Sequence, residues 1–599
     1  MKERKEIDDR FKWDLTKIYK SYDEWKNEYD LIKNEIDKIE SYKESFLNSS
    51  DDLYDFMKLV EFVSLKLDKL YTYAHLHNDE DMSNSFYQEL EGKARDLYIL
   101  YSEVISFVEP EILKCGEDKI NDFLSDNKKL EYFKKDFNEI FRYKGYTLSE
   151  KEEKLLSTLS NAFSNPEDVY SYLTDTDMKF GFIKDEDGNE VELTNSNFSI
   201  YRTSSNQVVR RDAFITMFNA FKQYKNTLAA TLSGNVDILN KMAKIRGFSS
   251  SLEASLFNEE IDVSIYNNLI GNINNNLDKL FKYFNIKKEI LGLDDLHIYD
   301  TYAKVVDNNK KKYSFEEAKE LVINAVKPLG DEYNKIIASA FSDGWIDIYP
   351  NKSKRSGAYS GGSYDTLPYL LLNYEGEYND VSTLAHELGH SVHSFLTRSN
   401  NSPVTGDYKI FVAEVASLVN ELLLAKYMLK NSSSTQEKLV ILNDLLDLYK
   451  ATIFRQVMFA EFERDIAKLN EDGEILTSDL LCEKYFELNK KYFGDNVICD
   501  EEIKYEWMRI PHFYYNFYVY KYAIGLCCAS RIVDNILSEK DGSLDKYINF
   551  LSSGSRKSPL ELLKDTDCDL SSNEVFDSAM KIFNDLIDEF VLLNNERSE

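Results

Sequence analysis

Long segments of the chain repeat apolar residues at the spacing of an α-helix. In the stretch "LYDFMKLVEFVSLKLDKL", which begins at Leu53, the apolar residues that follow this period stand at positions 53, 56, 57, 60, 63, 67 and 70. Similar patterns recur through the N-terminal half and after residue 408. Only eight prolines and 22 glycines interrupt the 599 residues, which favours long helices. We therefore predict a mainly α-helical protein.

Strand patterns are few and short. The stretch 179–194, "KFGFIKDEDGNEVELT", predicts a β-hairpin that turns at Asp187 and Gly188. Two more strands are predicted over 345–350 ("WIDIYP") and 366–375 ("TLPYLLLNYE"), with "SGAYSGGSYD" between them as a loop. A domain boundary is expected near residue 200. It divides the chain into an N-terminal helical domain that ends in the hairpin (1–200) and a second domain (201–599).

The charge and the composition exclude several classes of protein. The chain has 105 acidic and 73 basic residues, a net charge of −32, and no basic cluster, so nucleic acid is not an expected partner. Its start, "MKERKEIDDRFKWDLTKIY", lacks the apolar centre of a signal peptide, and no apolar run is long enough to span a membrane. Six cysteines without a CxxC pair indicate free thiols. We expect a cytoplasmic protein that does not bind membranes.

Three of the seven histidines lie in the stretch "LAHELGHSVH", residues 384–393. With Asp380 as a plausible N-cap, this stretch predicts a helix on which His386 and His390 project from one face, one turn apart. Two imidazoles at this spacing can bind one tetrahedral metal ion, and zinc is the favoured ion. Glu387 points to a neighbouring sector, so it can act as a general base on a water molecule without being a ligand.

A third ligand must come from outside this stretch or from its end. A metzincin would have a histidine at position 396, which is a leucine. His393 lies about 10.5 Å along the axis from His386, so we interpret it as a packing or supporting histidine. Glu414 lies in the apolar stretch "KIFVAEVASLVNELLLAKYML", where a carboxylate is unfavourable unless it is paired or bound to metal. Glu421 shares its face and either orients a ligand imidazole or is an ordinary exposed acid.

A second group of polar aromatic residues lies in "RIPHFYYNFYVYKYAIG", residues 509–525. If the chain is helical after Pro511, four of these residues form a stripe along one face of the helix, and Tyr514 and Tyr520 point elsewhere. The four are His512, Tyr515, Tyr518 and Tyr522. Such a stripe is more often part of a core than of a site, but its hydroxyl groups and imidazole could also stabilise the oxyanion of peptide hydrolysis.

These motifs together resemble a known family. "HELGH", "FVAEVAS" and "RIPHFYYNFYVYKYA" are similar to motifs of the thimet-type zinc oligopeptidases, peptidase family M3, and most of all to its oligoendopeptidase F group. The resemblance covers nearly the whole chain. It includes "FKWDLTKIY" near the start and "WIDIYPNKSKRSGAYSGGSYDTLPYLLLNY" before the histidines.

The resemblance implies a fold of two mostly helical lobes around a deep substrate channel, with the catalytic zinc metallopeptidase domain over 201–599. It implies one zinc ion per chain, with Glu387 as general base and with His386, His390 and Glu414 as ligands. It also implies transition-state donors at His512, Tyr515, Tyr518 and Tyr522. The strand "PYLLLNY" would pair with an extended peptide. The expected function is internal cleavage of short oligopeptides.

Three alternatives stay open on the sequence. One is a zinc exopeptidase with the same chemistry, which would need a group that binds a substrate terminus. The second is a helical scaffold with a structural metal, although such sites usually have four protein ligands. The third is a carrier that binds peptides without cutting them.

Overall fold

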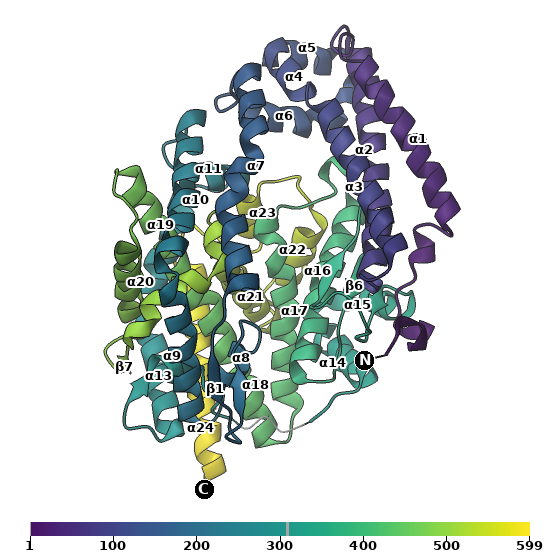
Figure 1. Ribbon diagram of the computed structural model, residues 1–599. Coiled ribbons are helices and arrows are strands. Elements are labelled where there is room, and N and C mark those ends of the chain that lie inside the picture. Colours follow the sequence, from purple (N-terminus) through teal and green to yellow (C-terminus); the bar gives the residue numbers. More distant parts are fainter. Residues whose placement is uncertain (1, 307–310, 599) are drawn as a thin grey trace. The chain divides into compact units, whose positions relative to one another are not determined.

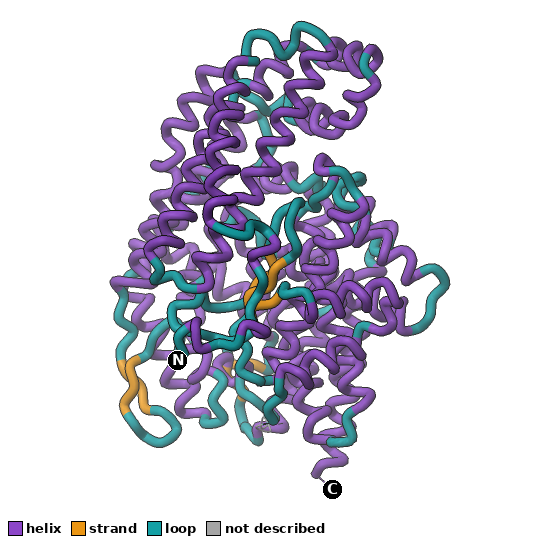
Figure 2. Tube along the Cα trace, turned by 90° about the vertical axis from the view of Figure 1, so that its right-hand side faces the viewer, coloured by secondary structure: helices purple, strands orange, loops and turns teal. Residues whose placement is uncertain are grey.

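Helices make up most of the computed structural model, which describes residues 2–306 and 311–598 (Figure 1). Strands are confined to a few short pieces (Figure 2). The prediction of a mainly helical fold is therefore confirmed. Among the described residues, no helix combines the length and the apolar character needed to cross a membrane.

Contacts between residues divide the chain into two compact units. Unit 1 consists of Met1–Thr147, Lys311–Tyr427 and Ile532–Thr566, and unit 2 consists of Leu148–Lys310, Met428–Arg531 and Asp567–Glu599. Each unit is therefore assembled from three separate segments, and residue 200 lies inside unit 2. The division into a domain over 1–200 and a catalytic domain over 201–599 stays a prediction, as does the channel between two lobes.

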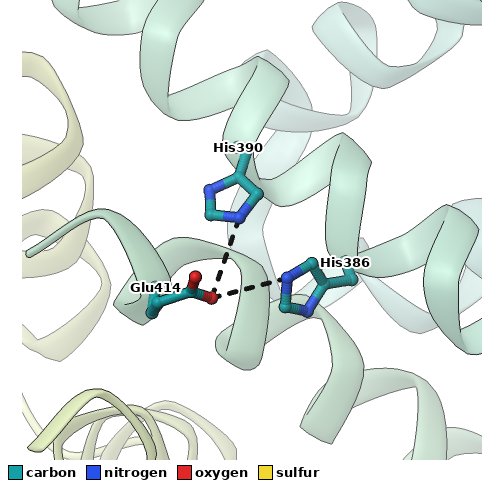
Figure 3. A group of neighbouring side chains, drawn as sticks. All are labelled: His386, His390 and Glu414. Atoms are coloured by element: carbon teal, nitrogen blue, oxygen red, sulfur yellow. Dashed lines mark ion pairs between the residues drawn. The ribbon is translucent and has the colours of Figure 1, made fainter. Parts of the chain in front are cut away.

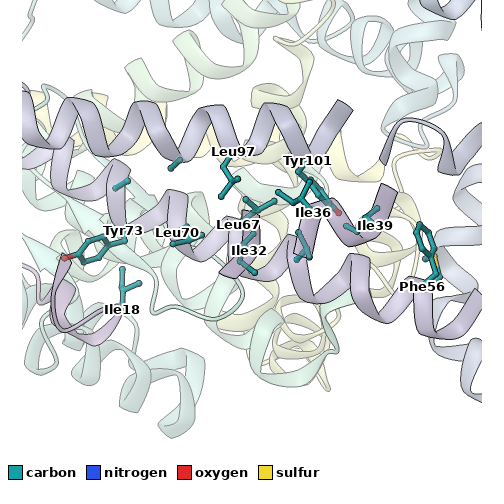
Figure 4. Close-up of a cluster of buried hydrophobic side chains, with 14 of the residues drawn as sticks. Ile18, Ile32, Ile36, Ile39, Phe56, Leu67, Leu70, Tyr73, Leu97 and Tyr101 are labelled. Atoms are coloured by element: carbon teal, nitrogen blue, oxygen red, sulfur yellow. The ribbon is translucent and has the colours of Figure 1, made fainter. Parts of the chain in front are cut away.

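The first helices of unit 1 enclose an apolar core of their own. They are α1 (Tyr22–Ser41), α2 (Ser50–Glu80), α3 (Ser85–Ile105), α4 (Val108–Cys115), α5 (Glu117–Asp126) and α6 (Lys134–Arg142). Buried residues from α1, α2 and α3 meet in this core, among them Ile36, Leu67 and Leu97 (Figure 4). The helix predicted from residue 53 is confirmed as α2, and Ser49 caps its first turn by accepting a hydrogen bond from Asp52 N–H.

The second segment of unit 1 contains a three-stranded sheet with the order β4-β6-β5. β4 (Ile346–Asp347) runs parallel to β6 (Tyr369–Leu371), and β5 (Tyr359–Gly361) runs antiparallel to it. The two predicted strands are confirmed, but they are shorter than predicted. The prediction of a loop over "SGAYSGGSYD" is wrong, because it contains β5. The expectation that "PYLLLNY" pairs with a peptide is also wrong, because β6 already has a partner on each side.

A buried lysine anchors this sheet. Lys354 donates hydrogen bonds to the carbonyl oxygens of Asp347 and Leu372 at 3.2 and 2.6 Å, so it joins the ends of β4 and β6. It also forms an ion pair of 2.7 Å with the Asp347 carboxylate, whose other partner is Arg4. Because Lys354 and Asp347 are both buried, each charge requires the other, and the pair fixes the sheet relative to the N-terminus.

The rest of unit 1 contains the histidine-rich helix, α16, and further helices. They are α14 (Phe315–Ala325), α15 (Gly330–Ser342), α16 (Tyr378–Asn400), α17 (Ile410–Asn431, whose last residues belong to unit 2), α22 (Ser543–Ser552) and α23 (Pro559–Asp565). α16 contacts β5, β6 and α22, so the predicted small sheet does lie beside it. The prediction of Asp380 as N-cap is wrong by one turn. Glu377 is the N-cap, and Asp380 accepts its backbone N–H in a capping box.

Unit 2 is a second set of packed helices. They are α7 (Glu150–Tyr172), α8 (Phe198–Arg202), α9 (Gln207–Gln223), α10 (Lys225–Arg246), α11 (Ser251–Asn258), α12 (Val263–Asn274), α13 (Leu277–Leu291), α18 (Thr435–Tyr449), α19 (Arg455–Glu471), α20 (Ser478–Phe493), α21 (Tyr520–Leu537, whose last residues belong to unit 1) and α24 (Glu574–Ser598). Its strands are β1 (Phe182–Lys184), β2 (Glu190–Glu192), β3 (Leu296–His297) and β7 (Val497–Ile498). β1 and β2 form the predicted hairpin.

Candidate metal centre

Three side chains from two helices of unit 1 direct their donor atoms toward one point (Figure 3). His386 and His390 come from α16 and Glu414 comes from α17. Glu414 Oε2 lies 3.5 Å from His386 Nε2 and 3.8 Å from His390 Nε2. A tetrahedral ion with bonds of about 2.0–2.2 Å separates its ligand atoms by about 3.3–3.6 Å. The three residues therefore fit a metal ion with little movement.

The two helices approach closely enough for this because α16 has a glycine at the crossing point. A Cβ atom on Gly389 would lie 2.6 Å from both Ala416 O and Ser417 Cα. Any larger residue would push the two backbones apart. Asn420 of α17 strengthens the crossing by donating a hydrogen bond of 3.1 Å to Ala385 O on α16. The glycine between Glu387 and His390 thus determines whether Glu414 can reach the imidazoles.

Other polar groups orient the three donors. Glu421 Oε2 lies 3.1 Å from His386 Nδ1, which leaves Nε2 directed at Glu414. Ser382 donates a hydrogen bond of 3.0 Å to the other oxygen of Glu421. Glu421 therefore contacts the imidazole that it is predicted to orient, and it is not an ordinary exposed acid. This arrangement is typical of metal-binding histidines, in which the second ring nitrogen is held by a carboxylate.

The electrostatics of the group favour a cation. Burial lowers the pKa of His386, but its hydrogen bonds to Glu414 and Glu421 outweigh this effect and raise the pKa to about 10. Burial and the charge on His386 lower the pKa of His390 to about 4. Burial raises the pKa of Glu414, and the two imidazoles reverse that shift and hold it below its usual value. The carboxylates thus bind positive charge at this point, whether it is a proton or a metal ion.

Glu387 lies beside this group and not in it. It is buried, and the backbone N–H of Ser360 in β5 lies near enough to its carboxylate to offset part of the effect of burial on its pKa. Burial raises the pKa of Glu387 to about 7. Ser360 is held in turn by Ser391 of α16, with 2.8 Å between the two hydroxyl oxygens. Ser391 also donates a hydrogen bond of 2.9 Å to the backbone carbonyl oxygen of Glu387, so the sheet edge is joined to the helix turn that carries Glu387.

His393 belongs to the packing of unit 1. Its ring stacks on that of Tyr408 at a centroid distance of 3.7 Å and an angle of 4°. The imidazole is buried, and burial lowers its pKa to about 3. The interpretation of His393 as a packing histidine is therefore confirmed.

The segment around His512, in unit 2, is not the continuous helix that the spacing predicts. A 3₁₀ turn covers Pro511–Tyr514, and α21 begins only at Tyr520. Between them, Asn516 and Phe517 take left-handed φ angles of 55° and 61°. The prediction of the helix is wrong because such angles break it.

The four residues of the predicted stripe nevertheless lie together. The His512 ring is 5.4 Å from that of Tyr515 and 6.1 Å from that of Tyr522, and Tyr518 is 5.4 Å from Tyr522. None of the four is fully buried, whereas Tyr514 and Tyr520 are. We call these four residues the His512 cluster.

Comparison with known proteins decides the family of this chain. The family model described as "Peptidase family M3" matches residues 200–582, and the one described as "Oligopeptidase F" matches residues 111–180. The chain belongs to peptidase family M3. The resemblance inferred from the motifs is thereby confirmed, and the chain is a peptidase of the metallo-oligopeptidase kind.

Relatives of this M3 peptidase match it over nearly their whole length. Oligopeptidase PepF of Bacillus subtilis (strain 168) is 42% identical over 98% of this chain and 88% of its own. An oligoendopeptidase F homolog of Lactococcus lactis subsp. lactis (strain IL1403) is 38% identical over 98% of each chain. A crystal structure from Chlamydophila abortus gives a TM-score of 0.91 at 36% identity, covering 99% of this chain and 100% of that one. That of oligoendopeptidase-F from Enterococcus faecium gives 0.75 at 32%, covering 96% and 99%.

Some residues that shape the candidate sites of this M3 peptidase could not be identified as such from the sequence. Glu463 of α19 is buried, and it accepts a hydrogen bond of 3.2 Å from Phe517 N–H, inside the left-handed turn of the His512 segment. Ser255 donates a hydrogen bond of 2.7 Å to Asn516 O in the same turn. Ser360, which holds Glu387, lies in a stretch that predicts a loop. All three act through long-range contacts, which local patterns do not reveal.

The contacts around Glu414 and Glu421 give a first prediction. Glu414→Ala removes one of three donors, so we expect purified protein to lose most of its bound metal. Glu421→Ala removes only the partner of His386, so metal affinity should fall by about 10–100-fold. Metal content and affinity are measured by mass spectrometry and by competition with a chelator. Ser382→Ala, which breaks only the bond to Glu421, should have the smallest effect. If Glu414→Ala holds metal as tightly as the natural chain, another residue is the third ligand.

Proposed function

We propose that this chain is a zinc endopeptidase that hydrolyses internal bonds of short oligopeptides. The observation that carries the proposal is the group of His386, His390 and Glu414 with the buried carboxylate of Glu387 beside it. Two imidazoles and a carboxylate are a donor set that suits zinc, and three protein ligands leave one position open. When bound, zinc supplies a Lewis acid that activates water and polarises a carbonyl group. A cytoplasmic location is proposed with it, because all six cysteines are free thiols.

Glu387 is proposed as the general base. Its carboxylate takes a proton from the attacking water and passes it to the nitrogen of the leaving group. The bonds between Ser360, Ser391 and the Glu387 carbonyl oxygen position this helix turn beside the sheet edge, so little reorganisation is needed during the reaction. Glu387 is the only carboxylate of this set that has no contact with the imidazole nitrogens in the described part of the chain, which suits a base better than a ligand.

The edge of the sheet offers a place for an extended substrate. β5 is the outer strand next to α16, and its Ser360 N–H already faces away from β6 toward Glu387. An extended peptide that pairs with β5 would therefore run past the candidate base. We propose β5, in place of the β6 strand expected from the sequence, as the strand that aligns the peptide.

The His512 cluster is proposed to supply hydrogen bonds to the oxyanion of the tetrahedral intermediate. This assignment rests on the family resemblance of the motif. The partial exposure of His512 and Tyr522 supports it, because a donor must be able to reach the substrate. Burial lowers the pKa of His512, and the charge of Arg455 adds to the effect, so its imidazole is neutral at pH 7 and can donate one N–H.

The alternatives have weaker support. A structural metal in a scaffold would leave no purpose for a buried carboxylate beside an open ligand position. An exopeptidase with the same centre differs from our proposal only in how it holds a substrate terminus. A carrier that does not cut peptides would not need a general base.

The proposed function predicts which peptides are cut. A mixture of peptides that are acetylated at the N-terminus and amidated at the C-terminus should be cleaved at internal bonds, since an endopeptidase needs no free terminus. A chelator should abolish the cleavage, and added zinc should restore it. Mass spectrometry of the products gives the position of each cut. Cleavage that requires a free terminus would favour the exopeptidase, and the absence of any metal-dependent cleavage would favour the carrier.

The role of Glu387 predicts that metal binding and turnover can be separated. Glu387→Gln should keep the metal, because its side chain is not a donor, and should lower kcat by roughly 10²–10⁴-fold, because the proton acceptor is lost. Metal content and rate are measured on the same preparation. Ser391→Ala is the control for disturbed packing, since it removes a neighbouring hydroxyl group without removing the carboxylate. A Glu387→Gln enzyme with a near-normal rate would exclude this base.

The His512 cluster predicts a loss that appears mainly in kcat. Tyr522→Phe removes one partly exposed hydroxyl group, and if that group donates to the oxyanion, kcat should fall by about 10²–10³-fold. Tyr514→Phe is the matched control. Its hydroxyl group is buried and bonded to Thr231 at 2.7 Å, so the change should lower stability by about 1 kcal/mol and leave kcat nearly unchanged. Equal losses in both variants would show that the fold and not the donor is responsible.

A further inference from the structure

Three arginines of unit 2 converge on two aromatic rings. The Cζ atom of Arg202 lies 3.8 Å from the centre of the Tyr302 ring and 5.8 Å from that of Phe198. Arg509 lies 5.0 Å from the Phe198 ring. Arg455 donates a hydrogen bond of 2.7 Å to the Tyr302 hydroxyl. We call Arg202, Arg455 and Arg509 the arginine cluster. It stands out in a chain whose net charge is −32.

The carboxylates near this cluster are already paired. Glu506 accepts two hydrogen bonds from Arg455, at 2.9 and 3.2 Å, and a third from Tyr485 at 2.6 Å. Asp447 forms ion pairs with Lys450 at 2.7 Å and with Lys287 at 3.5 Å. Glu506 and Asp447 are thus paired with Arg455, Lys450 and Lys287, and neither forms an ion pair with Arg202 or Arg509.

Arg202 and Arg509 hold the unmatched charge. Within residues 2–306 and 311–598, neither forms an ion pair with a carboxylate, and the Nε atom of each is buried without a hydrogen-bond partner. Arg509 has one long hydrogen bond, of 3.5 Å, to Asn195 O. A guanidinium group does not give up its proton in a protein, so burial leaves it in need of an anion.

The anion must reach these arginines from the solvent side. Both side chains are partly exposed. The neighbouring cavity, which Tyr302, Lys450 and Arg455 line, has a volume of about 20 Å³, and Arg202 and Arg509 do not line it. Such a cavity has room for little more than one water molecule. A larger anion would therefore have to approach Arg202 and Arg509 from their exposed side.

Two arginines of the cluster lie near His512. Arg509 precedes His512 by three residues, at the end of the 3₁₀ segment Glu501–Arg509. Arg455 lies near enough to His512 for its charge to help lower the pKa of that imidazole. A peptide that contacts the His512 cluster would therefore pass near Arg509, which shares the Phe198 ring with Arg202.

We propose that Arg202 and Arg509 bind a carboxylate of the peptide substrate and so determine substrate specificity. The carboxylate is either the C-terminus of the peptide or an Asp or Glu side chain. A guanidinium group matches a carboxylate with two parallel hydrogen bonds, and its planar face stacks on aromatic rings such as Tyr302 and Phe198. The inference rests on the proposed peptidase function and adds the class of peptide that is preferred.

The test compares peptides that differ only in one carboxylate. A quenched fluorescent peptide is made with a free C-terminus and with a C-terminal amide, and the amide series carries Glu or Gln at successive positions. In the natural enzyme, the kcat/KM of one carboxylate peptide should be about 10–100-fold higher than that of the matching uncharged peptide. The difference should appear mainly in KM. A preference for the free acid identifies the C-terminus, and a preference for Glu at one position identifies a side chain.

Variants then assign the preference. The ratio of kcat/KM for the carboxylate peptide to kcat/KM for the matching uncharged peptide should fall toward one in both Arg202→Gln and Arg509→Gln. The ratio is taken within one preparation, so a loss of folded protein cancels. Arg211→Gln, which removes an exposed cation of α9 that is paired with Asp212, is the control for net charge and should keep the ratio.

The outcomes separate this inference from the proposed function. Cleavage of the amide peptides supports the proposed function by itself. If those peptides are cut and no carboxylate changes the rate, the inference alone is wrong. It is also wrong if the preference survives in both arginine variants, or if Arg211→Gln removes it equally.

Discussion

The close crossing of α16 and α17 at Gly389 is the contact on which the candidate metal centre depends. There the two backbones approach so closely that a Cβ atom on Gly389 would lie 2.6 Å from Ala416 O. The crossing brings Glu414 to within 3.8 Å of both imidazoles, and it brings Glu421 to the far side of His386. Because the ligands come from separate helices, the geometry of the centre is only as well defined as this crossing. The hydrogen bond from Asn420 of α17 to Ala385 O of α16 helps to hold the two helices together at this crossing.

Buried charges organise both units, and each is matched in a different way. In unit 1, Lys354 and Asp347 are paired and also bonded to the backbone, so their charges fix the sheet that carries β5. β5 in turn presents Ser360 to Glu387. In the metal centre the excess is negative, since three carboxylates surround two imidazoles, and a cation satisfies it. In the arginine cluster the excess is positive, and Arg202 and Arg509 require an anion. Unmatched buried charge thus indicates a ligand in both places, with opposite sign.

The strained turn at Asn516 and Phe517 shows how a site can depend on distant residues. Two consecutive residues other than glycine in the left-handed region cost of order 1–3 kcal/mol each, so the surroundings must hold them. Glu463 and Ser255 do so through the Phe517 N–H and the Asn516 carbonyl oxygen. Burial raises the pKa of Glu463 to about 8, so this carboxyl group is mostly protonated at neutral pH and adds no charge beside the His512 cluster.

The helical fold, the family and the residues of the candidate metal centre could be predicted from the sequence, because periodic patterns and short motifs carry them. The spacing of His386 and His390 places both on one helix face whatever the rest of the chain does. The apolar neighbours of Glu414 likewise mark it as a carboxylate that needs a partner. Long-range contacts set the features that local patterns leave open. β5 forms through its pairing with β6. α16 begins one turn earlier than predicted, so Glu377 and not Asp380 is its N-cap. The chain bends after His512 because contacts with Glu463 and Ser255 offset the strain of a left-handed turn, and those contacts join residues far apart in the sequence.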